Sequence, residues 1–195
     1  MISPPPAPQR RFLDWSLVTW VKIALLSSLS TLLMLALQVP LFPSAPFLTY
    51  DLSEVPALVA GFALGPLPGL AVVVVKNLLF VVQRPQLAEL VGIPLNTVAG
   101  SILVGVSSAF YWRRKTRTRA LAGLVLGALA MAALMIPVNL LVWPFFTWLL
   151  TGQDMPVVTS FVVATVTPFN LLKGALTGTL TFLVYKRFSR FLKRW

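Results

Sequence analysis

Long apolar runs, separated by short breaks rich in proline and glycine, occupy most of this sequence. A helix needs about 20 apolar residues to cross the hydrocarbon core of a bilayer, and several runs reach that length. The strands of a membrane barrel would instead alternate apolar and polar residues over about 10 positions, a pattern that this sequence lacks. With 57% hydrophobic residues among 195, the chain exceeds the usual apolar content of soluble domains. The sequence therefore predicts an all-α membrane protein.

The apolar runs divide into six predicted transmembrane helices. Their ranges are residues 17–39, 53–65, 67–83, 92–112, 120–149 and 158–185. The first run is too long for the apolar core of a signal peptide, so we interpret it as a retained span. The sequence predicts one six-helix transmembrane domain over residues 15–187, between a proline-rich tail of residues 1–14 and a basic tail of residues 188–195.

The basic residues predict how these helices are oriented. Most of the 16 lysines and arginines fall in three clusters, before the first helix, between the fourth and fifth, and after the sixth. An even number of spans places all three clusters on one side, and lysine and arginine gather on the cytoplasmic side of membrane proteins. We therefore expect both termini inside the cell, an N-in/C-in arrangement. The net charge of +11 thus indicates topology and not binding to nucleic acid.

Several chemical classes are disfavoured by what the sequence lacks. It contains no histidine and no cysteine, which removes thiol nucleophiles and most zinc and iron sites. No G-x-x-x-x-G-K-[ST] motif is present, so the chain has no P-loop for ATP. G-x-S-x-G and H-E-x-x-H are missing as well. We expect no enzymatic activity and no cofactor, and an energy source for any transport must be supplied by another subunit.

One lysine stands inside the last predicted helix, in the sequence TPFNLLKGAL. A charged lysine at the centre of a bilayer costs at least about 2.5–3.5 kcal/mol. Asn170 and Lys173 are three residues apart and share a helix face, while Pro168 removes one backbone hydrogen bond just before them. This combination favours a polar ligand-binding lining over simple interhelical contacts.

Two other predicted helices carry similar polar groups. Asn139 lies between two prolines in IPVNLLVWP, and Lys76 precedes Asn77 in VVVVKNLLF. For a single asparagine, hydrogen bonding between helices is the simpler interpretation. For Lys76 two interpretations are equally open, a binding residue or an ion pair with Glu54 or Glu89.

The segment before the second predicted helix suggests an outer cap. Asp51 and Glu54 have the spacing of an N-cap residue and its acidic partner, which by itself explains their presence as a stabilised helix end. The preceding residues 40–50 include Phe42, Phe47 and Tyr50 and no basic residue. They are suited to form a lid over an outward-facing pocket.

Four elements together resemble a known family. They are YDLSEVPALVAGFALGPLPGLAVVVVKNLLF, NTVAG, IPVNLLVWP and TPFNLLKGAL, in this order over residues 45–180. They look like the riboflavin-binding S component, the substrate-capture subunit, of energy-coupling factor (ECF) transporters. The resemblance implies six transmembrane helices in the plasma membrane of a prokaryote, with a vitamin pocket near the outer side. It also implies partners, namely a transmembrane coupling protein and two cytoplasmic ATPases.

The resemblance also implies roles for particular residues. Asn170 and Lys173 match the family positions that address the polar edge of the flavin ring, and Asn139 resembles a further pocket residue. Lys76, Asn77 and Tyr50 complete the substrate-binding set that we predict. Family members often dock the coupling protein through A-x-x-x-A on the first helix. The nearest match here is Ala24 with Ser28, in which serine replaces the second alanine.

Three alternatives follow from the same residues. The ligand could be flavin mononucleotide or another vitamin, and a phosphate would need a cation such as Lys76 or Arg84 near the ribityl end. The chain could be an intramembrane enzyme in which Lys173 pairs with Ser160 or Thr167. It could also be a structural membrane subunit in which the prolines and asparagines serve only packing.

Overall fold

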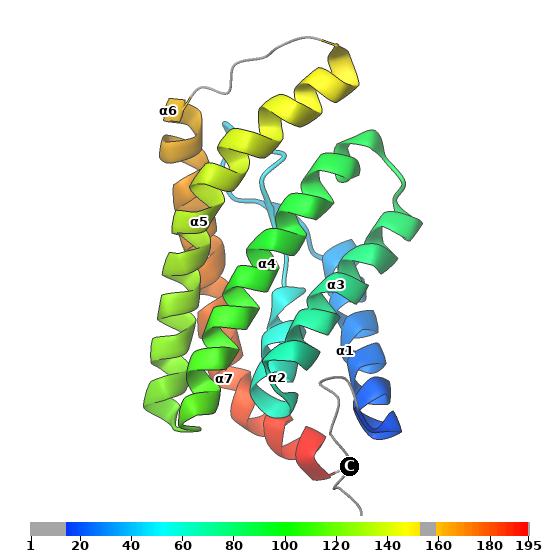
Figure 1. The fold of residues 1–195 in the computed structure, drawn as a ribbon, viewed down its shortest axis with the longest axis vertical. Helices are drawn as coiled ribbons and strands as arrows, with labels where there is room; N and C mark the ends of the chain where they lie inside the picture. The colour runs from blue at the N-terminus through cyan, green and yellow to red at the C-terminus, as the bar shows by residue number, and fades with distance from the viewer. Residues whose placement is uncertain (1–14, 153–158, 195) are drawn as a thin grey trace, which may run out of the picture.

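A computed structural model describes residues 15–152 and 159–194 of the chain. The helices run lengthwise beside one another as a bundle (Figure 1). The elements are α1 (Leu17–Ala36), β1 (Val39–Pro40), β2 (Thr49–Tyr50), α2 (Glu54–Leu64), α3 (Pro66–Gln83), α4 (Leu87–Arg113), α5 (Arg117–Thr151), α6 (Thr159–Phe161), the π-helix η1 (Val162–Val166) and α7 (Thr167–Arg194). The predicted proline-rich tail of residues 1–14 lies outside the described residues.

The observed helices follow the predicted apolar runs closely. Among the described residues, four helices, within α1, α3, α4 and α5, are long and apolar enough to cross a membrane, and α2 is a shorter apolar helix. α4 begins at Leu87, five residues before its predicted start at 92, and α7 continues to Arg194, beyond the predicted domain boundary at 187. The protein is therefore a mostly helical bundle, as the sequence predicts.

Helix ends are fixed by local chemistry. The side chain of Ser16 accepts a hydrogen bond from the Thr19 N–H at the start of α1, and Thr116 accepts one from the Arg119 N–H at the start of α5. Both residue types are favoured at helix N-caps. Gly65 has a φ of 125° between α2 and α3, a backbone conformation that glycine adopts without steric cost. This glycine lets the chain reverse direction at the GPLPG turn.

Small residues allow the helices to pack closely. A Cβ atom on Gly69 would lie 2.8 Å from the Gly61 Cα, and one on Gly123 would lie 2.7 Å from the Ser107 carbonyl oxygen. Neither position has room for a larger side chain, so α2–α3 and α4–α5 approach at backbone distance. The large side chains of Leu58, Phe62, Leu103 and Met131 fill the core between them.

The last helical segment contains the irregularity expected from Pro168. Backbone turns just before the proline widen into η1, and the Thr167 hydroxyl donates a hydrogen bond of 3.2 Å to the Val162 carbonyl oxygen. Proline lacks a backbone N–H, and a π-bulge is one way in which a helix accommodates such a break.

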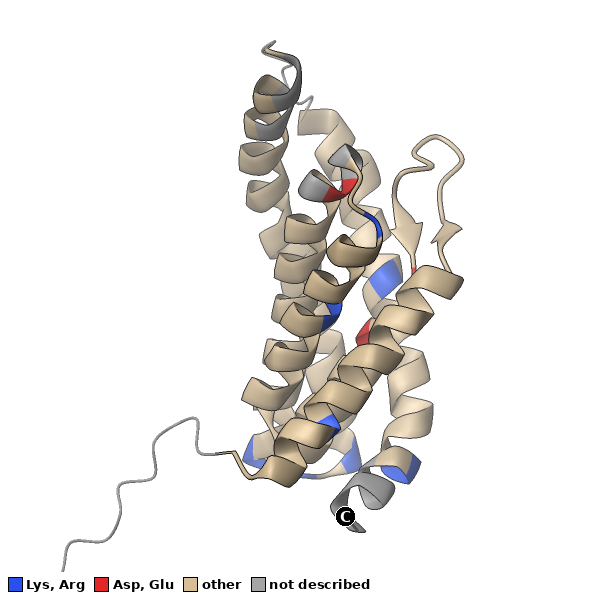
Figure 2. Ribbon diagram, turned by 90° about the vertical axis from the view of Figure 1, so that its right-hand side faces the viewer, with Lys and Arg blue, Asp and Glu red and all other residues tan. Residues whose placement is uncertain are grey.

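Charged residues are unevenly distributed along the bundle. Figure 2 shows that lysines and arginines gather at one end, the end that holds the α4–α5 connection and the last part of α7. The described residues there include Arg113, Arg114, Lys115, Arg117, Arg119, Lys186 and Arg187. The described acidic residues lie away from this end, within the bundle and near its opposite end (Figure 2).

Candidate ligand-binding site

A cavity of about 500 Å³ opens in the half of the bundle opposite the basic end. This volume is within the range of pockets that hold small molecules and cofactors. Its lining comes from α1, the β1–β2 loop, β2, the segment before α2, α4, α5, η1 and α7. The apolar side chains include Met34, Phe47, Leu48, Val91, Ile93, Leu95, Met135, Trp143, Val166 and Phe169, and the polar ones are Gln38, Thr49, Asp51, Glu89, Asn96, Asn139, Asn170 and Lys173.

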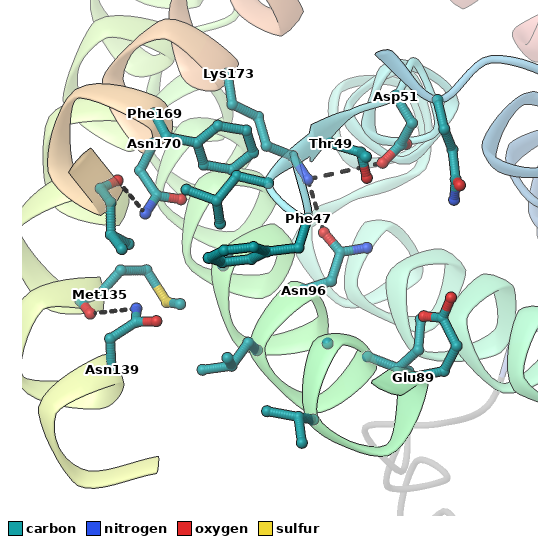
Figure 3. Close-up of a pocket in the computed structure, with 18 of the residues that line it drawn as sticks. Phe47, Thr49, Asp51, Glu89, Asn96, Met135, Asn139, Phe169, Asn170 and Lys173 are labelled. Atoms are coloured by element: carbon teal, nitrogen blue, oxygen red, sulfur yellow. Dashed lines mark hydrogen bonds and ion pairs between the residues drawn. The ribbon is translucent and has the colours of Figure 1, made fainter. Parts of the chain in front are cut away.

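Lys173 is held at the lining by two partners from other segments. Its Nζ atom donates a hydrogen bond of 2.7 Å to Asn96 Oδ1 and lies 3.8 Å from Asp51 Oδ2. Figure 3 shows these groups converging from α7, α4 and the segment before α2. A buried ammonium group needs such partners, since an unpaired charge in an apolar interior is costly. The contacts therefore hold the lysine at a defined position facing the cavity.

A short chain of hydrogen bonds orients Asn96. Its Nδ2 atom donates to Asn77 Oδ1 at 3.2 Å, and Asn77 Nδ2 in turn donates to the Thr97 hydroxyl at 2.9 Å. Because the amide nitrogen of Asn96 is engaged, its oxygen is the atom that faces Lys173. Asn77 thus supports the site from behind without lining the cavity.

Asn139 and Asn170 are placed by the same local device on two helices. Each follows a proline by two residues, and each Nδ2 atom donates to the carbonyl oxygen four residues earlier. Asn139 donates to Met135 at 2.7 Å and Asn170 donates to Val166 at 3.0 Å. The Oδ1 atom of Asn139 also accepts a hydrogen bond of 3.1 Å from the Trp143 Nε1 atom. Both amides line the cavity, as Figure 3 shows.

The predicted lid segment contributes to the cavity wall. The strands β1 and β2 pair antiparallel, with Val39 opposite Tyr50, and the loop between them carries Phe47 into the lining. The Phe47 ring lies 5.9 Å from the Trp143 ring on α5 and 6.1 Å from the Phe161 ring on α6. These aromatic contacts connect the loop to the opposite side of the bundle.

Three predicted binding residues lie outside the cavity lining. Lys76 donates to Glu54 Oε1 at 2.8 Å and to the Ser53 hydroxyl, and Lys76 and Glu54 have no exposed surface. The structure thus favours the ion-pair interpretation of Lys76, and Asn77 has the supporting position described above. The Tyr50 hydroxyl lies 3.5 Å from the Thr177 hydroxyl, next to the site but not on its surface.

The acidic residues before α2 differ from the predicted capping pair. The N-cap residue of α2 is Ser53, without a side-chain cap, and Asp51 instead accepts a hydrogen bond of 2.8 Å from the Ser53 N–H. Asp51 Oδ2 also lies 3.8 Å from Lys173 Nζ, so the Asp51 carboxyl group faces the cavity lysine.

Sequence reasoning missed Asp51, Asn96 and Glu89 as lining residues. Asp51 fitted a helix cap equally well. Asn96 follows Pro94 by two residues, the same spacing as at Asn139 and Asn170, and this signal could have identified it. A second signal was Lys173 itself, because a buried lysine requires an acceptor from another segment. The predicted docking residues Ala24 and Ser28 are both exposed on α1.

A bundle of apolar helices with a largely apolar pocket that carries a few fixed polar groups defines a helical membrane protein that binds a small molecule. The cavity is lined mainly by apolar and aromatic groups with a few fixed polar ones, which is the usual composition of such sites.

Comparison with known proteins identifies the family. Residues 18–185 match the model of the family described as ECF transporter, substrate-specific component, and the chain belongs to this family. Its members are transport components, so the enzyme alternative with Ser160 or Thr167 is not supported.

Two curated relatives are riboflavin transporters. The chain is 35% identical over 181 residues to the riboflavin transporter FmnP of Bacillus subtilis (strain 168), covering 90% of this chain and 92% of the relative. It is 29% identical over 177 residues to the riboflavin transporter RibU of Staphylococcus aureus (strain TCH60), covering 89% and 92%. A solved structure of the S component of a bacterial ECF transporter superposes with a TM-score of 0.75 at 28% identity, covering 90% of this chain and 97% of that one.

Proposed function

We propose that this protein captures riboflavin outside the cell with high affinity and delivers it inward as the S component of an ECF-type uptake transporter. The observation that carries the proposal is the position of Lys173, held by Asn96 and Asp51 at the wall of a cavity that is otherwise largely apolar. The names of the relatives, all of them riboflavin transporters, point to the same ligand.

The chemistry of the ligand fits this lining. Riboflavin has a flat ring system with apolar faces and with carbonyl and imide groups along one edge. The aromatic rings of Phe47 and Phe169 suit the faces, and the Lys173 ammonium suits a flavin carbonyl. Asn139 and Asn170 offer amide groups that donate and accept hydrogen bonds, so they suit the edge as well. We propose these polar residues as direct ligand contacts, with Lys76, Asn77 and Tyr50 as supporting residues.

We further propose that the protein lies in a prokaryotic plasma membrane and crosses it six times, with both ends inside. The sixth crossing consists of α6, η1 and α7 together. The gathering of lysines and arginines at one end of the bundle supports this orientation (Figure 2), because these residues prefer the cytoplasmic side. The cavity then faces the outer half of the membrane.

The energy for uptake must come from partners in this proposal. The chain has no P-loop motif, so we propose a transmembrane coupling protein with two cytoplasmic ATPases. Ala24 and Ser28, exposed on α1, are the proposed contact with the coupling protein. Replacing Ser28 by tryptophan should then reduce uptake by cells and leave riboflavin binding by the purified protein intact. Leu183→Trp, at an exposed position of α7, is the control.

The direct test is a fluorescence titration of the detergent-purified protein with riboflavin. Saturable quenching at nanomolar ligand, or a yellow protein after purification, is the expected result. A folded protein that is colourless and quenches neither riboflavin nor flavin mononucleotide would refute flavin binding. Other vitamins, the remaining alternative for an S component, would then be screened in the same way.

A further inference from the structure

The cavity has an acidic side chain at the end away from Lys173. Three of the described lining residues carry a charge, Asp51, Glu89 and Lys173. Asp51 and Lys173 face one another at 3.8 Å, whereas the described part of the chain offers Glu89 no ion-pair partner within 4.0 Å. Among the charged residues of the lining, Glu89 is therefore the one with no ion-pair partner among the described residues, and the cation that acts on it, Arg84, lies outside the lining.

Glu89 faces the cavity along α4. It precedes Asn96 by seven residues, which is about two helical turns, so the two side chains share a face roughly 10 Å apart along the helix axis. A Cβ atom placed on Gly92 would lie 3.7 Å from Glu89 Oε2. Because Gly92 also lines the cavity, the Glu89 carboxylate lies along the cavity wall. Figure 3 shows Glu89 apart from the cluster of Phe47, Asn96 and Lys173.

The two cations named above as candidates for binding a phosphate, Lys76 and Arg84, do not line the cavity. Lys76 is fully buried against Glu54 and Ser53. Arg84 lies over the Phe80 ring, 5.9 Å from its centroid, and neither residue is part of the lining. In the proposed pose, with the flavin ring edge at Lys173, Glu89 offers a hydrogen-bond acceptor to the ribityl chain at the other end of the lining.

We infer that Glu89 is a specificity-determining residue that selects neutral riboflavin against phosphorylated flavins. This inference rests on the proposed function. A ribityl hydroxyl can donate a hydrogen bond to the Glu89 carboxylate. A phosphate monoester carries a charge of about −1.5 to −2 at neutral pH and is repelled by the same carboxylate. Partly buried charges interact more strongly than they do in bulk water, so the repulsion lowers the affinity for flavin mononucleotide.

The test is a pair of titrations of the full-length protein in detergent, one with riboflavin and one with flavin mononucleotide. The wild-type protein should prefer riboflavin. In Glu89→Gln the ratio of the two affinities should fall about tenfold, because the charge is removed and an acceptor is kept. Glu89→Lys should lower the ratio further, since it places a cation at the ribityl end.

A matched control adds the same charge outside the lining. Thr118 is exposed near the start of α5, at the basic end of the bundle, and Thr118→Lys raises the net charge by one without changing the cavity wall. Its affinity ratio should stay within about twofold of the wild-type value. An unchanged ratio in Glu89→Gln with riboflavin still bound, or an equal change in Thr118→Lys, would overturn the inference. A wild-type protein that binds neither flavin would instead refute the proposed function on which the inference rests.

Discussion

Lys76 Nζ lies 2.8 Å from Glu54 Oε1, and both side chains are completely buried between α2 and α3. Hydrogen bonds connect this pair to the binding site. Lys76 donates a hydrogen bond to the Ser53 hydroxyl, and the Ser53 N–H donates to Asp51. Asp51 in turn faces Lys173. The buried pair therefore positions the start of α2 and, through it, one of the partners of the cavity lysine.

Removing one member of this pair should destabilise the protein strongly. We expect Lys76→Met or Glu54→Leu to cost about 3–5 kcal/mol, because each leaves a buried charge without its partner. Thermal unfolding in detergent, followed by circular dichroism, measures the effect. The double variant Lys76→Met with Glu54→Leu should lose less than the sum of the single changes. Additive losses would mean that the two residues do not act as a pair.

Lys173→Ala should weaken riboflavin binding more than tenfold, which corresponds to about 1.4 kcal/mol or more. The ammonium group is held at the cavity wall by Asn96, so its loss removes a fixed donor to the flavin edge. The fluorescence titration described above measures the change. Lys115→Ala is the control, since Lys115 lies at the basic end, against the Trp112 ring. Unchanged affinity in a folded Lys173→Ala protein would remove this residue from the site.

Phe47→Ala should increase the rate at which riboflavin dissociates by about tenfold. The aromatic contacts of Phe47 with Trp143 and Phe161 connect the loop to α5 and α6, and an aromatic pair contributes about 0.5–1.5 kcal/mol beyond its buried area. Stopped-flow displacement of bound riboflavin gives the rate. The matched control is Phe42→Ala, because Phe42 lies in the same loop but outside the lining. Equal rates for the two variants would argue against Phe47 as a closing contact.

Gly100→Ala should destabilise the protein, whereas Gly105→Ala on the same helix should not. A Cβ atom on Gly100 would lie 2.6 Å from Glu54 Oε1, while one on Gly105 meets its nearest neighbour, Leu70, at an ordinary 3.6 Å. Overpacking of this kind costs about 1–3 kcal/mol. Midpoints of thermal unfolding compare the two variants directly. A Gly100→Ala protein as stable as Gly105→Ala would show that the buried pair can move aside.

The helices and part of the site could be predicted from sequence because their signals are local. The lengths of the apolar runs predicted the helical segments. A proline two residues before an asparagine indicated Asn139 and Asn170, both of which line the cavity. The partner of Lys76 could not be chosen, since Glu54 and Glu89 were both plausible and only the packing of α2 against α3 decides between them. Asn96 follows Pro94 by the same two residues and could have been predicted from that spacing, whereas its contact with Lys173, 77 residues away in the chain, could not.

The length of α2 has a consequence for how the ligand enters. Its 11 residues span about 16 Å, roughly half of the ~30 Å hydrocarbon core. In the proposed orientation, the β1–β2 hairpin and its loop therefore fill the outer half of this crossing with irregular backbone. Such backbone is tolerated at membrane depth only where protein covers it or where it borders water. A hairpin that swung sideways would expose peptide groups to lipid tails, so the entrance for the ligand must open toward the external water and not into the bilayer.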